Sequence, residues 1–261
     1  MHRLMAVGIS VLFLVASGNA RAQMTGNVDR LKADLYGDDL DRGVAAASAL
    51  GSLKDPNARD ALIIGLQLGA PAKLLSAMLE ALGLHKSPNS VDLLKTFVSN
   101  RNPEIRISAL KAMAGIEGPR TTDIVIKALG DSNPMVRARA ARILGERAER
   151  KATSSLLKML IRGDRSAAAP LGEVGGAETA KQLAELLGEV PDSALAIAFG
   201  EMLKRKDFGP DPLRTEVVKT LGKIPGAEST AALVEYISDV PEKEDRLSKK
   251  AAEKILQGRK K

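Results

Sequence analysis

The chain has 261 residues, no cysteine, no tryptophan and an aromatic content of 2%. These numbers exclude a disulfide-stapled fold, a lipoprotein acylated on an N-terminal cysteine, and a nucleic-acid platform that stacks bases on aromatic rings. The formal net charge of +7 is modest and spread along the chain, so it does not by itself indicate binding to nucleic acid or to a membrane.

The first 22 residues have the three parts of a secretory signal peptide. Arg3 provides the basic start, an apolar run follows, and Ala20-Arg21-Ala22 is a small-residue cleavage site. The apolar run is shorter than the roughly 20 residues that a membrane span needs, and no later stretch is apolar enough for one. We expect cleavage after Ala22, which leaves residues 23–261 as a single domain in the periplasm or outside the cell. Because Arg3 and Arg21 are lost with the signal, the net charge falls to +5.

A motif that ends in a large apolar residue followed by glycine recurs along the mature chain, with weaker copies such as Met113-Ala114-Gly115. The marker residues of successive copies are Leu50, Leu82, Met113, Leu144, Leu171, Phe199 and Leu221. They are separated by 32, 31, 31, 27, 28 and 22 residues. A period near 30 is typical of proteins built from stacked helix pairs.

Each copy of the motif predicts two α-helices. The second helix begins at a proline signal such as Asn102-Pro103, Asn133-Pro134 or Val190-Pro191, and the glycine is expected to end it in the left-handed conformation. A shorter apolar helix precedes it, for example at residues 91–98. Since no alternating strand pattern of any length occurs, the sequence predicts an all-α fold.

Two segments near the C-terminus depart from this period. The spacing of 22 residues between Phe199 and Leu221 leaves no room for a first helix. Residues 204–212 are therefore expected to join two second helices directly, at a bend in the stacking. From Pro241 to about Gln257 a charge-rich last helix is expected to act as the polar cap that the final repeat needs.

The sequences NPEIRISALKAMAG at 102–115 and NPMVRARAARILG at 133–145 resemble the HEAT repeat family, particularly its short bacterial subtype similar to the phycobilisome-lyase-like repeats. The resemblance covers about residues 28–257. It implies an α-solenoid of about seven stacked two-helix repeats with a C-terminal capping helix. It is nearly silent about function, because one fold serves many functions.

The family pattern also places an acidic or amide residue six positions before the repeat arginine, where polar bonds form a structural ladder between repeats. This sequence matches the ladder at two pairs, Asn100 with Arg106 and Asp131 with Arg137. Elsewhere the pattern is interrupted. The arginine position holds Asp164 in one repeat, and Arg214 is preceded by Phe208 where the acid is expected.

The chain lacks the residues that common catalytic and metal sites require. Apart from His2 in the signal, His85 is the only histidine, so zinc sites of the usual kinds and histidine-assisted nucleophiles cannot be built. HEAT-like di-iron enzymes carry His-Glu pairs, whereas His85 is followed by Lys86. We interpret His85 as a surface residue and expect a protein with no catalysis, metal or cofactor of its own.

Long basic side chains on the second helices are the partner-binding candidates. Arg139 and Arg142 lie opposite the apolar stripe of their helix, and Lys111 and Lys219 occupy the Arg142 position in other repeats. Second helices line the concave surface in solenoids of this kind, so the pattern predicts a basic groove for an acidic protein surface. The alternative is an ordinary solvated basic face.

The sequence therefore favours an exported, monomeric, protein-binding scaffold, with no nucleic-acid partner. One alternative is a lyase- or chaperone-like factor for a cofactor-bearing protein, which the resemblance to lyase-like repeats implies. Another is binding of an anionic polymer or a membrane surface through the basic C-terminus. The cations of that terminus are Lys249, Lys250, Lys254, Arg259, Lys260 and Lys261.

Overall fold

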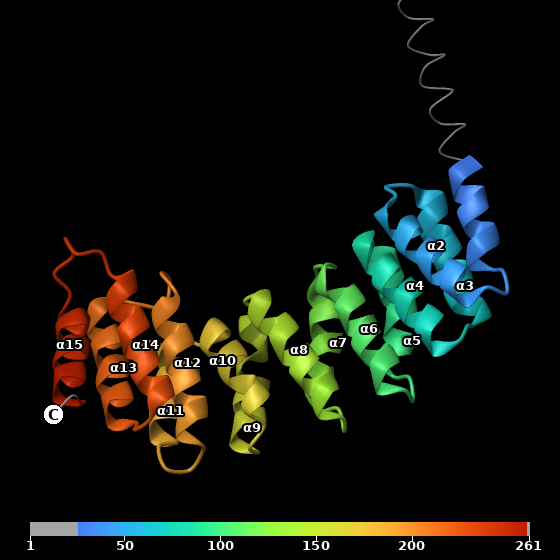
Figure 1. Cartoon of the computed structure of the whole chain (residues 1–261). Helices are drawn as coiled ribbons and strands as arrows, with labels where there is room; N and C mark the ends of the chain where they lie inside the picture. The colour runs from blue at the N-terminus through green and yellow to red at the C-terminus, as the bar shows by residue number, and fades with distance from the viewer. Residues whose placement is uncertain (1–25, 260–261) are drawn as a thin grey trace, which may run out of the picture. The chain divides into compact units, whose positions relative to one another are not determined.

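The computed structural model describes residues 26–259 (Figure 1). The predicted signal peptide at 1–22 lies outside the described residues. Within them the chain consists of helices, turns and one isolated bridge, so the predicted all-α repeat fold is confirmed. None of the described helices is long and apolar enough to cross a membrane. The chain forms two compact units, with the boundary between Glu117 and Gly118.

The first unit begins with helical residues 26–35. Five α-helices and one 3-10 helix follow: α2 (Leu40–Ser52), α3 (Pro56–Leu68), α4 (Ala72–Leu84), η1 (Pro88–Ser90), α5 (Val91–Val98) and α6 (Pro103–Ala114). The even-numbered helices α2, α4 and α6 pack side by side in one layer. Helix α3 packs against α2 and α4, and α5 packs against α6. The first helices α3 and α5 therefore lie against the layer of second helices.

The second unit continues the same alternation. Its helices are α7 (Pro119–Ala128), α8 (Pro134–Glu146), η2 (Arg150–Ala152), α9 (Thr153–Ile161), η3 (Arg165–Ala167), α10 (Ala168–Val174), α11 (Ala177–Glu185), α12 (Asp192–Lys204), α13 (Asp211–Lys223), α14 (Ala227–Asp239) and α15 (Leu247–Arg259). Helices α8, α10, α12 and α14 form one layer, which we call the second-helix layer. Helices α7 and α9 pack against α8 and α10.

Helix starts follow the predicted asparagine-proline signals. The side chain of Asn133 accepts hydrogen bonds from the main-chain nitrogens of Met135 and Val136, at 2.9 and 3.4 Å. Asn102 accepts one from Glu104 at 2.9 Å. In both helices proline occupies the first turn, where its missing N–H removes no helical hydrogen bond. The predicted first helix at 91–98 is α5.

The repeated glycines do not end the second helices in the left-handed conformation, so that interpretation of the motif is wrong. Gly51, Gly83 and Gly172 all lie inside helices. A Cβ atom on Gly83 would lie 2.5 Å from the Cα of Ala112 in α6, and one on Gly51 would lie 2.8 Å from Ala81 in α4. The glycines therefore permit close approach of neighbouring second helices, a contact that any side chain would prevent.

Two non-glycine residues take the left-handed place after a second helix. Lys86 has φ of 48° after α4, and Ala148 has φ of 50° after α8. The Ala148 nitrogen donates to the carbonyl of Gly145 at 2.7 Å, and the Glu149 nitrogen donates to Leu144 at 2.9 Å. This is the paired hydrogen-bond pattern of a Schellman helix end, which glycine normally completes.

The expected direct junction of two second helices at 204–212 is also wrong. Helix α12 packs against α14, whereas α13 packs mainly against α15 and makes smaller contacts with α11, α12 and α14. Helix α13 thus takes the place of a first helix, although it ends in a Leu-Gly pair, and α14 is the second helix of that repeat. Counted from the helix at residues 26–35 to α14, the helices of the described range then form seven pairs, which agrees with the expected number.

The last helix packs where the sequence places a cap, but it starts later than expected. Helix α15 begins at Leu247, and it covers α13 and α14. Residues 241–246 have no helical structure. The Asp211 carboxylate of α13 accepts hydrogen bonds from the main-chain nitrogens of Leu247 at 2.8 Å and Ser248 at 3.4 Å. A distant residue therefore caps α15, and this fixes its first residue.

Candidate partner-binding surface

A row of glutamates crosses the second-helix layer of the second unit. Its members come one from each helix: Glu146 of α8, Glu173 of α10, Glu201 of α12 and Glu235 of α14. We call this set the glutamate row. Three of the four directly follow the repeat glycine, at Gly145, Gly172 and Gly200. Because the repeats are in register, the same sequence position returns to the same place on each helix.

Glu173 lies at the centre of the glutamate row. Burial, reinforced by the negative charges of Glu201 and Glu146, raises the pKa of Glu173 above its ordinary value, while Lys204 opposes the shift. The carboxylate lies over Gly145, where its Oε2 would be 1.9 Å from an added Cβ. The glycine therefore makes room both for helix α10 and for this carboxylate. A row of like charges held this way stores repulsion that a cationic partner would relieve.

Lys204 joins two members of the glutamate row. Its Nζ lies 3.0 Å from Glu201 and 3.2 Å from Glu235, so it bridges α12 and α14. The hydrogen bond with Glu201 contributes most to the raised pKa of Lys204. The hydrogen bond with Glu235 also raises this pKa, and burial opposes both. This end of the row is partly neutralised, whereas Glu173 has no cation within hydrogen-bonding distance in the described residues.

The four basic candidates lie on three different helices. Arg139 and Arg142 lie on α8, and exposed Arg142 is 3.4 Å from Glu146 of its own helix. Lys111 belongs to α6 of the first unit and pairs with Glu80 at 2.8 Å. Lys219 is exposed, but α13 lies outside the second-helix layer. Of the four candidates, Arg139 and Arg142 of α8 are thus the two that lie in the second-helix layer of the second unit, next to Glu146.

Sequence reasoning missed the glutamate row, although a signal was available. The signal lies one position beyond the Leu-Gly motif, in the residue that follows each repeat glycine. Gly145-Glu146, Gly172-Glu173 and Gly200-Glu201 show the acidic repeat directly. The fourth member, Glu235, carries no such signal, because Val234 stands at the glycine position in the final second helix.

The ladder arginines contact the turn before their own helix. Arg137 donates from Nη1 to the carbonyls of Asp131 at 2.9 Å and Ser132 at 3.1 Å. Arg106 donates in the same way to the carbonyl of Asn100 at 2.8 Å. The side chains of Asn100 and Asp131 accept main-chain hydrogen bonds within the same turns. Each pair therefore holds one turn together, in addition to any contact between repeats.

Asp164 extends the ladder, although the sequence alignment treats it as an interruption. It lies in the turn before η3 and accepts a hydrogen bond from Arg137 Nε at 2.7 Å. Burial by itself raises the pKa of Asp164, but hydrogen bonds from Ser166 and Arg137 outweigh it, so the pKa lies below its ordinary value. The side chains of Arg137 and Asp164 are 26% and 17% exposed, which protects this ion pair from solvent better than a surface pair.

His85 is half-buried and not on the open surface that the sequence suggested. Its Nε2 lies 3.1 Å from the carbonyl of Leu50, near the end of α2. Burial lowers the pKa of His85, which the hydrogen bond to Leu50 only partly opposes. The ring is therefore neutral at physiological pH and caps a helix end. Among residues 26–259 no group of three His, Asp or Glu side chains is arranged to hold a metal ion.

The basic C-terminus is largely engaged in internal contacts. Arg259 donates to the carbonyls of Leu221 at 3.0 Å and Ile224 at 2.7 Å, at the end of α13. Lys249 donates to the carbonyl of Val240 at 3.1 Å, and Lys250 lies 2.5 Å from Asp245. Residues 260 and 261 are outside the described range. This arrangement gives little support to the anionic-polymer alternative.

Several solved structures resemble the chain over most of its length. The complex of CpcE and CpcF of phycocyanin lyase from Nostoc sp. PCC7120 has 16% identity and a TM-score of 0.48, and the match covers 88% of this chain and 94% of that chain. An engineered protein has 18% identity and a TM-score of 0.47, covering 90% and 79%. Human deoxyhypusine hydroxylase in complex with glycerol has 18% identity and a TM-score of 0.41, covering 90% and 97%.

Comparison with curated proteins gives no match. The family of PBS lyase HEAT-like repeats matches residues 44–67. The family of HEAT repeats matches residues 60–131, 93–169 and 122–204, which together span more than half of the sequence. Together with the alternating helix layers described above, these matches show that the chain belongs to the HEAT repeat family.

Proposed function

We propose that this protein is an exported scaffold that binds another protein through the exposed face of the second-helix layer. The observation that carries the proposal is the charged row across α8, α10, α12 and α14, in which each helix supplies a residue at the same repeat position. Such an array suits an extended partner better than a small molecule, because it offers many weak contacts in line and no enclosed site.

The charges refine the expected partner. An acidic surface is attracted to Arg139 and Arg142, but the same surface would be repelled by Glu173 and Glu201. The partner that fits therefore places acidic groups over α8 and basic groups over α10 and α12. This alternation fixes the register of binding as well as its strength.

Export is the second part of the proposal. Its support is the basic start, the short apolar run and the Ala20-Arg21-Ala22 site. N-terminal sequencing of protein isolated from the native host is expected to give Gln23 as the first residue. Retention of Met1 in all of the material would contradict export by this signal.

A lyase- or chaperone-like role is the second candidate. The match of the PBS lyase HEAT-like repeat to residues 44–67 favours it. In that case the partner carries a covalently bound cofactor, and it is expected to lose the absorbance of this group in cells that lack the protein. If the absorbance of the partner is unchanged in such cells, the lyase- or chaperone-like role is contradicted and the scaffold role is retained.

Charge reversal tests the binding surface. The tagged mature protein is used to isolate its partner from the native compartment, and the partner is identified by mass. The variant R139E/R142E, and separately E146K/E235K, is expected to reduce recovery at least about tenfold, as the loss of charge-assisted contacts does. Matched controls on the other face of the unit are K158E/K181E and E178K/E185K, which change the charge equally. Undiminished recovery with both folded surface variants would overturn the assignment of this surface.

A further inference from the structure

A groove of about 530 Å³ lies between the end of α7, helix α9 and the turns at residues 129–131 and 162–164. Its charged lining residues are the cations Lys127, Arg137, Lys158 and Arg162 and the carboxylates Asp131 and Asp164. The lining therefore has a net charge of +2 (four cations minus two carboxylates). The groove runs along two first helices of the second unit and shares no residue with the glutamate row.

Two of these cations lie on the side of α9 that borders the groove. The lining residues at this helix are Ser155, Lys158, Met159 and Arg162. Residues three and four positions apart share one face of a helix, so these side chains point to the same side. Leu156 and Leu160 lie on the adjacent face and are buried in the core. Lys127 lies in the last turn of α7 and lines the groove from the other side.

The cations from the two helices lack partners within the described residues. The side chains of Lys127, Lys158 and Arg162 are exposed and form no hydrogen bond or ion pair in residues 26–259. Helix α9 contains no acidic residue. The one carboxylate of α7, Asp123, is paired with Lys151 at 2.6 Å. Three positive charges thus border the groove without a local counter-ion.

The two carboxylates of the lining are engaged with other groups. Asp164 accepts a hydrogen bond from Arg137 Nε at 2.7 Å, so this cation and this anion neutralise each other. Asp131 accepts a hydrogen bond from the main-chain nitrogen of Asn133 at 2.8 Å, within the turn before α8. Neither carboxylate forms a hydrogen bond or an ion pair with the three exposed cations in the described part of the chain.

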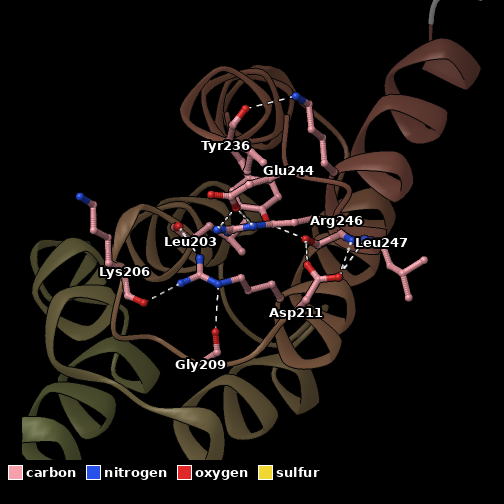
Figure 2. A network of polar contacts seen from close by, with 12 residues as sticks. Leu203, Lys206, Gly209, Asp211, Tyr236, Glu244, Arg246 and Leu247 are labelled. Carbon is pink, nitrogen blue, oxygen red and sulfur yellow. Dashed lines mark hydrogen bonds and ion pairs between the residues drawn. The ribbon is translucent and has the colours of Figure 1, made fainter. Parts of the chain in front are cut away.

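Cations in another part of the same unit are held by internal partners. Figure 2 shows Arg246 beside Glu244, to which its Nε donates at 2.6 Å. The buried Arg214 donates to the main-chain carbonyls of Leu203 at 2.9 Å and Gly209 at 3.0 Å. Those arginines hold their own turns together. The three cations between α7 and α9 have no such internal role in the described residues, which leaves their N–H groups available to a partner.

We propose that this groove binds an extended acidic segment of another protein. Cations on both sides of the groove fit carboxylates spaced along a chain, and Ile126 and Met159 of the lining provide apolar contact for the methylene groups of glutamate side chains. A lipid bilayer is flat, so it would meet the ridges beside a groove before its lining. The site is separate from the glutamate row and gives the second unit a basic surface on its first helices.

Fluorescence anisotropy with a labelled oligoglutamate peptide tests the proposal on the mature protein. The peptide is expected to bind saturably at low salt, with one site per chain, and to dissociate as salt screens the contacts. The variant K127Q/K158Q/R162Q is expected to weaken binding at least about tenfold, because it removes three charge-assisted contacts.

The matched control is K181Q/K219Q/K223Q, which removes three exposed lysines from the first helices α11 and α13, outside the groove. It changes the net charge equally and is expected to bind within about twofold of the parent. Cations in the last turn of a helix also stabilise that helix slightly, so the melting temperature of both variants is measured. The single variants K127Q and R162Q, each expected to weaken binding about threefold, keep the test independent of folding.

Three results would contradict the proposal. One is the absence of saturable binding of oligoglutamate to the parent protein. Another is equal weakening in the groove variant and in the matched control, which would show attraction by net charge alone. The third is binding to anionic phospholipid vesicles that the groove variant abolishes, without binding of oligoglutamate, which would assign the groove to a lipid surface. None of these results bears on the glutamate row, whose variants test the scaffold role separately.

Discussion

Ala148 is an alanine at a position whose left-handed backbone conformation favours glycine. It has φ of 50°, a conformation that costs an alanine on the order of 1 kcal/mol but costs glycine very little. The position is exposed, and its side chain is not part of the buried core. The hydrogen bonds that end α8 depend only on its main chain.

Replacement of Ala148 by glycine is therefore expected to stabilise the protein by about 0.5 kcal/mol, after subtraction of the larger chain entropy of unfolded glycine. Ala138→Gly, in the middle of the same helix, is the matched control and is expected to destabilise by about 1 kcal/mol. Urea unfolding of both variants measures the difference. Destabilisation by Ala148→Gly would show that the backbone at 148 is not left-handed.

Arg137 and Arg139 differ by two positions and have different roles. Arg137 makes hydrogen bonds to two carbonyls and to the Asp164 carboxylate, and Arg139 has no hydrogen bond or ion pair in the described residues. Arg137→Ala is expected to lower the free energy of unfolding by about 1–3 kcal/mol, and Arg139→Ala by less than about 0.5 kcal/mol. Equal shifts in thermal melting for the two variants would contradict this assignment.

At the level of helices, the repeat glycines set the spacing of the second-helix layers. An alanine at Gly83 would place its Cβ 2.5 Å from the Cα of Ala112, and neither main chain is able to yield without moving its helix. Gly83→Ala is expected to destabilise by about 2 kcal/mol through overpacking. In α15, Gly258 has open space around it, so Gly258→Ala is expected to be neutral or to stabilise slightly. Thermal melting of the two variants gives the comparison, and similar melting temperatures would rule out a packing role for Gly83.

Helix starts were predictable because the signals that determine them are local. Asn133 and Pro134 satisfy the first turn of α8 with groups that lie within three residues of each other. The layer to which a helix belongs is not a local property. Helix α13 ends in Leu-Gly like a second helix, but it takes the place of a first helix, because α12 packs against α14 and makes only a small contact with α13. No short segment of the sequence determines the layer to which α13 belongs.

The same distinction determines which candidate residues can be grouped from the sequence. Arg139 and Arg142 were placed correctly on one helix, because three residues separate them. The grouping with Lys219 failed, since it assumed that α13 lies in the second-helix layer. The role of Asp164 was missed because its partner Arg137 lies 27 positions away. Long-range contacts decide these roles, and a repeat alignment that slips by several residues hides them.

At the scale of the whole molecule, the net positive charge conceals an acidic strip. The chain has more Lys and Arg than Asp and Glu, yet the repeat register gathers four glutamates on one layer of the second unit. Net charge therefore indicates little about which partner a solenoid binds, because register concentrates one sign of charge on one face.

The strip also makes the stability of the protein depend on pH in a defined direction. The folded-state pKa of Glu173 is raised, first by burial and then by Glu201 and Glu146. A carboxyl group of this kind contributes stability that is fully present below its unfolded pKa, and that contribution is lost as the pH rises through the folded value. Glu173→Gln keeps the neutral form at every pH, so it is expected to raise the melting temperature at pH 7 and to have little effect near pH 3.

Asp164 supplies the opposite dependence within the same unit. Its lowered pKa means that its contribution is present above the unfolded value and is lost as the pH falls, so Asp164→Asn is expected to destabilise at pH 7 and much less near pH 3. Melting curves of both variants and the parent protein between pH 3 and pH 8 measure the two trends together. If Glu173→Gln lowered the melting temperature at pH 7, the Glu173 carboxylate would have to be held by a cation, as those of Glu201 and Glu235 are held by Lys204.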